Sequence, residues 1–242
     1  MSIKGFDDWL ATPQGQYVLH WEQAKHDLLV ADIFGFNAAQ LGLPQHDFLR
    51  ANRMPFRFRC DEKFTSLTAL RAKPDFLPFA NASVDLVILP HVLEFAAAPH
   101  QILREVERIL VPEGQLIVTG FNPFSLWGVR RKFARAHGAP PWRGQYLSVP
   151  RLKDWLALLG FETHAGCFGC YAPPVTREQW LQRWRFMELA GNRWWPYAGA
   201  AYIIQAIKRV HGMRLITPLR KERKAHAKSL ATVTQHTQRK EQ

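Results

Sequence analysis

The chain has 242 residues, enough for one sizeable hydrophobic core, and 47% of them are hydrophobic. It carries 32 Lys and Arg against 20 Asp and Glu, and the basic excess lies in its second half: 11 basic and 14 acidic residues precede Asn122, while 21 basic and 6 acidic residues follow from there. Three cysteines are too few for a disulfide framework, and no apolar run is long enough for a transmembrane segment.

These features exclude a disulfide-stapled scaffold and a membrane-spanning protein. The opening sequence MSIKGFDDWL has two acidic residues where a signal peptide would be apolar, so we expect a cytoplasmic location. The basic second half either contacts an anionic surface, such as lipid or nucleic acid, or is simply solvated.

The first third of the chain predicts a helix followed by two strands. The helix is expected over residues 13–33, the first strand and its turn over 38–43, and the second strand over 56–60, where apolar and basic side chains alternate. Asp61 and Glu62 come directly after this second strand. About ten residues, 44–54, remain for a helix between the two strands.

The most informative stretch is residues 75–123, which predicts a parallel βαβ unit. The run VDLVIL at 84–89 is typical of a strand that is buried on both faces. From Pro99 to Leu110 the apolar residues recur at intervals of three and four, which predicts an amphipathic helix. The string VPEG at 111–114 indicates a turn, and QLIVT at 115–119 the next strand.

Four short strings in this stretch resemble the class I S-adenosylmethionine-dependent methyltransferases, in particular their small-molecule enzymes. They are LPF at 77–79, VDLV at 84–87, VLEF at 92–95 and LVPEG at 110–114, in the order and at the separations of that family. The resemblance implies a three-layer α/β sandwich with a seven-stranded, mostly parallel sheet, which binds S-adenosylmethionine at the carboxyl ends of its strands.

By the same resemblance, a glycine at the first strand's tip approaches the methionine end of the cofactor, and an acid after the second strand accepts the ribose hydroxyls. The implied cofactor-binding residues are Gln40, Gly42, Asp61, Glu62, Asp75, Phe76, Leu77 and Pro90. The sequence departs from the family at this glycine loop, where Gly42 stands alone and Pro44 follows it. Neither a proline nor another residue with a Cβ lets the backbone come as close to a cofactor as a glycine does.

Candidates for chemistry and for the methyl acceptor follow the fourth and fifth strands. His91 is placed to act as a general base, although a hydrogen-bonded loop histidine is an equally ordinary interpretation. The resemblance implies that Asn122, Trp127 and Arg131 line the acceptor site. We expect no metal: His164, Cys167 and Cys170 are better explained as residues of a strand than as ligands.

The remaining chain predicts a helix over 149–160, a strand from Phe161, a Trp- and Arg-rich helix over 177–195 and a closing strand over 201–210. Trp180, Trp184 and Met187 would share one face of the Trp-rich helix, which either packs on the sheet, covers an apolar acceptor or lies at a membrane interface. We expect one domain, 1–212, with accessory segments 122–145 and 171–198, and a basic disordered tail, 213–242.

The sequence thus favours a methyltransferase that acts on a small, partly apolar or anionic acceptor. The alternative is an inactive relative, a binding or scaffold protein whose altered glycine loop no longer holds the cofactor. A nucleic-acid methyltransferase is disfavoured, because the fourth strand is followed by Leu89-Pro90-His91 and not by the Asn-Pro-Pro-Tyr type of string that base methylation uses.

Overall fold

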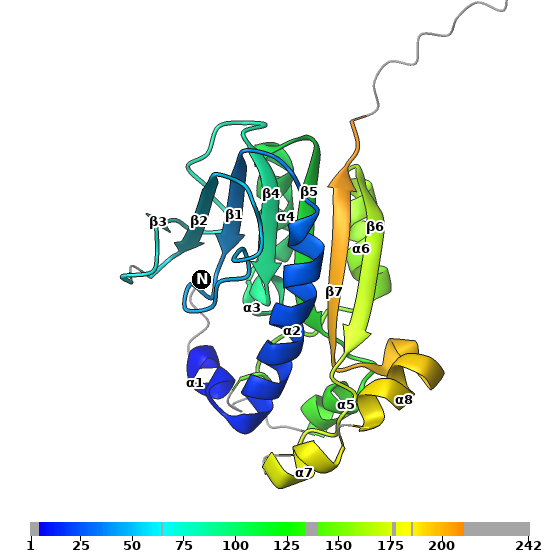
Figure 1. Ribbon diagram of the computed structural model, residues 1–242. Coiled ribbons are helices and arrows are strands. Elements are labelled where there is room, and N and C mark those ends of the chain that lie inside the picture. Colours follow the sequence, from blue (N-terminus) through cyan, green and yellow to red (C-terminus); the bar gives the residue numbers. More distant parts are fainter. Residues whose placement is uncertain (1–4, 64, 134–139, 176–177, 185, 211–242) are drawn as a thin grey trace, which may run out of the picture. The chain divides into compact units, whose positions relative to one another are not determined.

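The computed structural model describes residues 5–63, 65–133, 140–175, 178–184 and 186–210 (Figure 1). Within this part of the chain, seven strands form a single sheet in the order β3-β2-β1-β4-β5-β7-β6. All neighbours pair in parallel except β7, which is antiparallel to both β5 and β6. The predicted seven-stranded, mostly parallel α/β fold is therefore confirmed.

The strands have the following bounds: β1 Asn37–Leu41, β2 Phe56–Asp61, β3 Leu70–Arg71, β4 Val84–Pro90, β5 Leu110–Phe121, β6 Phe161–Gly169 and β7 Ala201–Lys208. The central strands β1 and β4 are almost wholly buried, and the apolar sequence of β4 is typical of a strand covered on both faces. Residues up to Val210 form one compact unit. The tail predicted over 213–242 lies outside the described residues.

The helices have the following bounds: α1 Phe6–Leu10, α2 Pro13–Ala31, α3 Val92–Phe95, α4 Pro99–Ile109, α5 Leu126–Phe133, α6 Val149–Leu158, α7 Glu178–Arg183, α8 Phe186–Trp194 and the 3-10 turn η1 Pro196–Ala198. Helix α2 covers one face of the sheet, α4 and α6 cover the other, and α5, α7 and α8 lie beyond one end of the strands (Figure 1). One apolar layer joins α1 and α2 to the sheet. The other joins α4 and α6 to its opposite face. None of the described helices is long and apolar enough to cross a bilayer.

The amphipathic helix predicted from Pro99 is α4, and its apolar side chains Ile102, Leu103, Val106 and Ile109 are all buried. The turn predicted at 111–114 does not interrupt the chain as a loop. It forms an irregular start of β5, where Glu113 has a φ of 64° and the register with β4 shifts between Val84 and Leu86. A left-handed residue at such a point bends the strand without ending it.

The Trp-rich segment differs from its prediction. Instead of one helix, the described residues between 178 and 194 form α7 and α8, which are separate short helices. Trp180 is on α7 and Met187 is on α8, so the predicted common face is wrong. Of the two cysteines predicted in a strand, Cys167 lies in β6 and is half-buried, whereas Cys170 follows the end of β6, with a φ of 63°, and is buried. Cys60 of β2 is also buried, and all three cysteines are free.

Candidate functional site

The candidate site lies at the carboxyl ends of β1, β2 and β4. The chain order of the strands reverses between β1 and β4, because β2 and β3 lie on one side of β1 and β5 lies beyond β4. Open α/β sheets bind ligands in the crevice at such a switch point, beyond the carboxyl ends of the strands. Gly42, Asp61 and His91 each follow directly from, or end, one of these strands.

The turn after β1 depends on Gly42. Its φ is +85°, a conformation that glycine adopts without strain, and its N–H donates to the Cys60 carbonyl at 2.8 Å. A Cβ on Gly42 would come within 3.0 Å of the Val92 Cγ2 atom. Any other residue here would therefore be strained and would crowd the start of α3.

Gln40 holds the rest of this turn in place. Its side-chain Nε2 donates to the carbonyls of Gly42, Leu43 and His46 at 3.1, 3.0 and 2.8 Å, and its Oε1 accepts from the Phe48 N–H at 3.0 Å. Gln40 is fully buried. The predicted direct contact between Gln40 and a cofactor is thus wrong, because its amide is used up in supporting the loop.

Residues 42–55, all of them described, contain no helix, so the helix expected over 44–54 is also wrong. Tight turns take its place, and Leu43 adopts a φ of 48°. The Pro44 carbonyl accepts from the Arg59 Nη1 at 2.9 Å, which fixes the turn against β2. Because no helix begins here, the site lacks the helix N-terminus that often faces a ligand's negative group.

Asp61, predicted to bind the ribose, ends β2 and is only 4% exposed. Its Oδ1 accepts from the Lys63 N–H at 3.2 Å. Asp7 of α1 lies close enough for its pKa to be affected: burial raises the pKa of Asp7, His46 lowers it and Asp61 raises it. Acidic groups from the N-terminal helix and from β2 therefore face the same crevice.

A pocket of about 240 Å³ adjoins this end of the sheet, between the residues after β2 and the segment that joins α3 to α4. It is lined by Glu62, Lys73, Pro74, Asp75, Ala96, Ala97, Ala98 and Ile102. The structure thus brings together Glu62 and Asp75, two of the predicted cofactor-binding residues. The volume is below the roughly 300 Å³ at which small-molecule pockets usually begin, so it fits part of a nucleoside cofactor.

The other residues predicted to bind the cofactor differ in their exposure to solvent. Phe76 is 78% exposed beside this region. Leu77 is buried in the core, and its N–H donates to the Glu105 Oε1 at 2.8 Å, so its side chain is not available to a ligand. Pro90 is buried at the end of β4, where it pairs with Thr119 of β5.

His91 lies beneath the crevice, with none of its surface exposed. Its Nε2 is 2.7 Å from the Glu22 Oε1 of α2, and its Nδ1 is 2.8 Å from the Glu94 Oε2 of α3. Glu94 also accepts from the Phe121 N–H. Burial by itself would lower the pKa of His91, but the two carboxylates raise it to about 10. This contradicts the predicted contact between His91 and an acceptor, because both ring nitrogens are engaged inside the protein.

Aromatic side chains of α1 cover His91 and the end of β5. The Phe6 ring is fully buried, 5.1 Å from the His91 ring and 5.4 Å from that of Phe95. Trp9 meets Phe121 edge-on at 5.8 Å. This helix therefore shields the ends of β4 and β5 from water.

Comparison with known proteins gives a family match over part of the chain. A family model described as a methyltransferase domain matches residues 51–118. That range contains Asp61, Asp75 and the carboxyl end of β4, and it begins after the altered glycine turn. This part of the chain is thus similar to a methyltransferase domain.

Solved structures of methyltransferases have a similar fold. A Haloferax volcanii methyltransferase, solved in complex with a methyltransferase activator, superposes with a TM-score of 0.59 at 18% identity over 88% of this chain and 99% of that one. A Thermotoga maritima S-adenosylmethionine-dependent methyltransferase gives 0.58 at 16% identity over 80% and 93%. At this level of identity the likeness concerns the fold.

Among curated proteins, the uncharacterized Escherichia coli protein YafS is 40% identical over 100 residues. The match spans 41% of this chain and 42% of the relative, so less than half of each protein is compared. The similarity says nothing about the activity of the relative.

Asn122 and Trp127, two residues predicted to line an acceptor site, make structural contacts. The Asn122 Nδ2 donates to the carbonyls of Tyr197 and Gly199 at 2.7 and 3.0 Å, which ties η1 to the end of β5. Trp127 is 1% exposed and its Nε1 donates to the Ala172 carbonyl at 2.9 Å. A direct acceptor contact by Trp127 is therefore contradicted. Arg131 donates from Nε to the Gly144 carbonyl at 2.5 Å and lies over the Tyr146 ring.

Sequence reasoning missed three residues of the methyltransferase-like centre. Glu22 reads as an ordinary charge on an amphipathic helix, and Phe6 and Asp7 belong to a short N-terminal helix that was not predicted. The two acidic residues that follow Phe6 suit the first turn of a helix and could have indicated α1. No local signal could have paired Glu22 with His91, which lies 69 residues away.

The buried histidines predict how the stability of the protein depends on pH. The raised pKa of His91, about 10, means that its stabilising charge is fully present below the ordinary value of 6.5 and is lost as the pH rises toward 10. Burial lowers the pKa of His26 to about 4, so stability also falls as the pH drops below 6.5. We therefore expect the free energy of unfolding to be greatest near pH 6.5.

Urea denaturation at a series of pH values measures this. The interval from about pH 6.5 to 8.5 reports on His91, because the buried thiols of Cys60 and Cys170, whose pKa burial raises from an ordinary value of 9.0, cost stability only at higher pH. The loss should not exceed about 1.4 kcal/mol per pH unit. In Glu22→Gln the loss should still begin near pH 6.5, but it should end at a lower pH and be smaller in total, because one of the two carboxylates that raise the His91 pKa is gone. A flat wild-type profile over this interval would show that His91 is not charged in the folded protein.

Proposed function

We propose that this chain is an S-adenosylmethionine-dependent methyltransferase that acts on a small, partly apolar or anionic acceptor. The observation that carries the proposal is the joint placement of Gly42 and Asp61 at the tips of the adjacent strands β1 and β2. The register of these strands pairs Leu41 with Cys60, so the two residues that follow lie at the same level of the sheet. A left-handed glycine and a buried carboxylate side by side suit the amino-acid and ribose parts of the cofactor.

The residues present fit the cofactor at three points. Gly42 presents a left-handed backbone without a side chain at the tip of β1. Asp61 and Glu62 supply carboxylates where the ribose hydroxyls are expected. The pocket lined by Glu62 and Asp75 is large enough for part of the adenosine. When bound, the cofactor would supply an activated methyl group on a sulfonium, which needs alignment with the acceptor more than acid-base help.

The chain's own residues would then orient the reactants and exclude water. Gln40 would hold the glycine turn in one conformation, through the hydrogen bonds that it makes to the loop backbone. Phe6 and Trp9 would keep water from the ends of β4 and β5. His91, with both nitrogens bonded to carboxylates, would fix α2 and α3 beneath the site and thereby position them.

An acceptor has a place beyond β5. A cavity of about 990 Å³ lies between α6, β6 and η1 and begins at Asn122 and Phe124. Asn122 follows β5, which is two strands from β1 and thus roughly 10 Å away from it. Phe124, Phe168 and Tyr197 give the cavity aromatic walls, while Lys153 and His164 offer donors for an anionic group. Such a lining supports an acceptor that is partly apolar and partly anionic.

One observation favours the competing function, a non-catalytic binding protein. Only one glycine remains in the loop after β1, no helix follows it among residues 42–55, and Phe6 and Trp9 cover the neighbouring strand ends. In this second function, the crevice at the strand ends would bind another molecule, and it would not bind S-adenosylmethionine.

Isothermal titration calorimetry with S-adenosylmethionine and S-adenosylhomocysteine separates the two functions. We expect binding of both at micromolar concentrations, and transfer of a radiolabelled methyl group to a fraction of extracted small molecules. Heat that stays at the dilution level up to millimolar ligand would favour the binding protein. Binding of both ligands without any methyl transfer would leave the cofactor site intact and refute the proposed acceptor.

A further inference from the structure

Large apolar side chains are exposed together at one end of the molecule, below the carboxyl ends of the parallel strands where α5, α7 and α8 lie (Figure 1). We call this surface the aromatic pole. Its members, which are 44% to 84% exposed, are Phe124, Leu126, Val129, Phe133, Trp180, Phe186, Trp194, Trp195 and Tyr197. Apolar groups of this size rarely gather on a monomer's surface without a partner.

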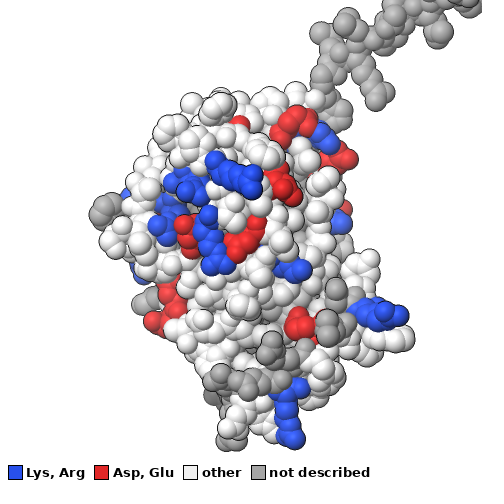
Figure 2. Space-filling model, viewed as in Figure 1, with Lys and Arg blue, Asp and Glu red and all other residues white. Residues whose placement is uncertain are grey.

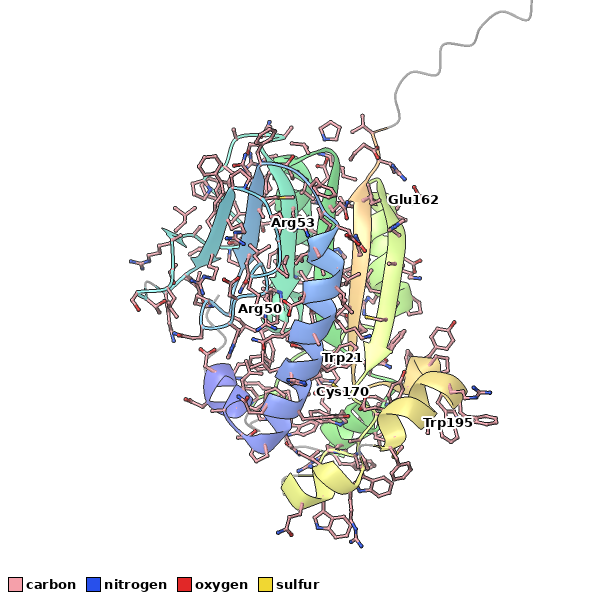
Figure 3. All side chains as sticks on the ribbon, in the orientation of Figure 1. Trp21, Arg50, Arg53, Glu162, Cys170 and Trp195 are labelled. Atoms are coloured by element: carbon pink, nitrogen blue, oxygen red, sulfur yellow. The ribbon has the colours of Figure 1, made fainter. Side chains whose placement is uncertain are left out.

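Hydrogen bonds join the segments of the aromatic pole. Arg130 of α5 donates to the Pro174 carbonyl, and the Trp127 Nε1 donates to the Ala172 carbonyl at 2.9 Å, which fixes α5 against the chain that leads to α7. Asn122 ties β5 to the Tyr197 carbonyl of η1 at 2.7 Å. Trp195, at the end of α8, points away from the protein (Figure 3). The exposed rings are therefore held on a fixed support.

Most charged residues on the helices of the aromatic pole are basic, and the acidic ones are Glu178 at the start of α7 and Glu188 of α8. Helix α5 carries Arg130, Arg131 and Lys132 and no acidic residue. Arg183 and Arg193 are exposed on α7 and α8. The acidic residue of α8 is turned inward: the Glu188 Oε1 accepts from the Tyr171 N–H at 2.9 Å and from the Tyr17 hydroxyl. Basic side chains stand out at this lower end of the molecule in Figure 2.

We propose that the aromatic pole is a membrane-interfacial surface that docks on anionic lipid bilayers. Trp rings and Arg side chains both favour the boundary between headgroups and acyl chains, and short helices with apolar and basic groups lie in that plane. A second copy of this chain would bring two basic surfaces together and be repelled. The phosphates of a nucleic acid would pair with the Arg residues, and its bases would stack on some of the rings. A nucleic acid has no apolar surface that would bury Leu126, Val129 and Phe133.

Co-sedimentation of the full chain with vesicles tests the proposal, and it does not depend on methyl transfer. We expect binding to phosphatidylcholine vesicles that contain phosphatidylglycerol and much weaker binding to phosphatidylcholine alone. The double variant Trp194→Ala/Trp195→Ala should bind at least about tenfold more weakly, because it removes two rings that enter the interface. Arg183→Glu/Arg193→Glu should lose the preference for anionic vesicles.

The matched control is Phe34→Ala/Phe36→Ala. These rings are 74% and 71% exposed just before the amino-terminal end of β1, and all variants keep the same basic tail. The control should bind like the wild type. The proposal is overturned when anionic vesicles do not bind the wild type, when the Trp variant binds equally well, or when the control loses as much. Binding to single-stranded RNA without vesicle binding would also overturn it. Thermal melting checks that every variant remains folded.

Discussion

Replacing His91 with leucine should lower the free energy of unfolding by about 3–5 kcal/mol, a large effect for a single polar substitution. His91 is fully buried between Glu22 and Glu94, at 2.7 and 2.8 Å. Without the imidazolium, two carboxylates remain buried with no cation between them, and the Glu22 Oε2 already lacks a hydrogen-bond partner. Urea denaturation at pH 7 measures the loss.

Two further variants show whether the lost stability comes from the unpaired carboxylates. His20→Leu changes an exposed histidine on the same helix as Glu22 and should leave stability nearly unchanged. Adding Glu22→Gln to His91→Leu should restore part of the stability, because one of the unpaired carboxylates is removed. The charged cluster would be refuted by a His91→Leu protein as stable as the wild type. It would also be refuted if the second substitution weakened the protein further.

Replacing Asp61 with asparagine should raise the Kd for S-adenosylhomocysteine about 10- to 100-fold. A hydrogen bond to a charged group contributes roughly 1.5–3 kcal/mol, and asparagine keeps the shape of the side chain while removing its charge. The folded protein should not lose stability, because Asp61 contributes to raising the pKa of Asp7 and its charge is therefore unfavourable to that neighbour. Calorimetric titration and thermal melting measure the two effects separately.

Asp32→Asn is the control for this experiment, since it removes the same charge from an exposed residue at the end of α2. It should bind the ligand like the wild type. Equal affinities for Asp61→Asn and wild type would mean that the carboxylate at the end of β2 does not contact the ligand. A large drop in melting temperature for Asp61→Asn would instead point to a structural function of this residue.

The sequence predicted those parts of the fold that depend on local periodicity. The apolar run at 84–89 and the helix spacing from Pro99 each follow from neighbouring side chains, and both elements are present as β4 and α4. The position of Asp61 was also predictable, because the alternation of β2 ends there. The relation of Gly42 to Asp61 then follows from the parallel pairing of two adjacent strands.

The parts that the sequence did not predict depend on contacts between distant segments. In the sequence, Gln40 has no feature that separates it from other strand residues. In the structure, its amide donates to the carbonyls of Gly42, Leu43 and His46. His91 follows a strand end, where a ligand contact is expected, but α1 and α2 bring Phe6 and Glu22 over it. Packing between separate helices has no signature in a single sequence, so the burial of His91 could not be foreseen.

The most direct test of the proposed cofactor site is a crystal structure of the protein with S-adenosylhomocysteine. We expect the nucleoside at the carboxyl ends of β1 and β2, with its ribose hydroxyls hydrogen-bonded to Asp61 or Glu62 and its amino-acid part against Gly42. Crystals grown at millimolar ligand would contradict this placement if the turn after β1 and the Phe6 ring filled the crevice and the ligand were bound elsewhere or not at all.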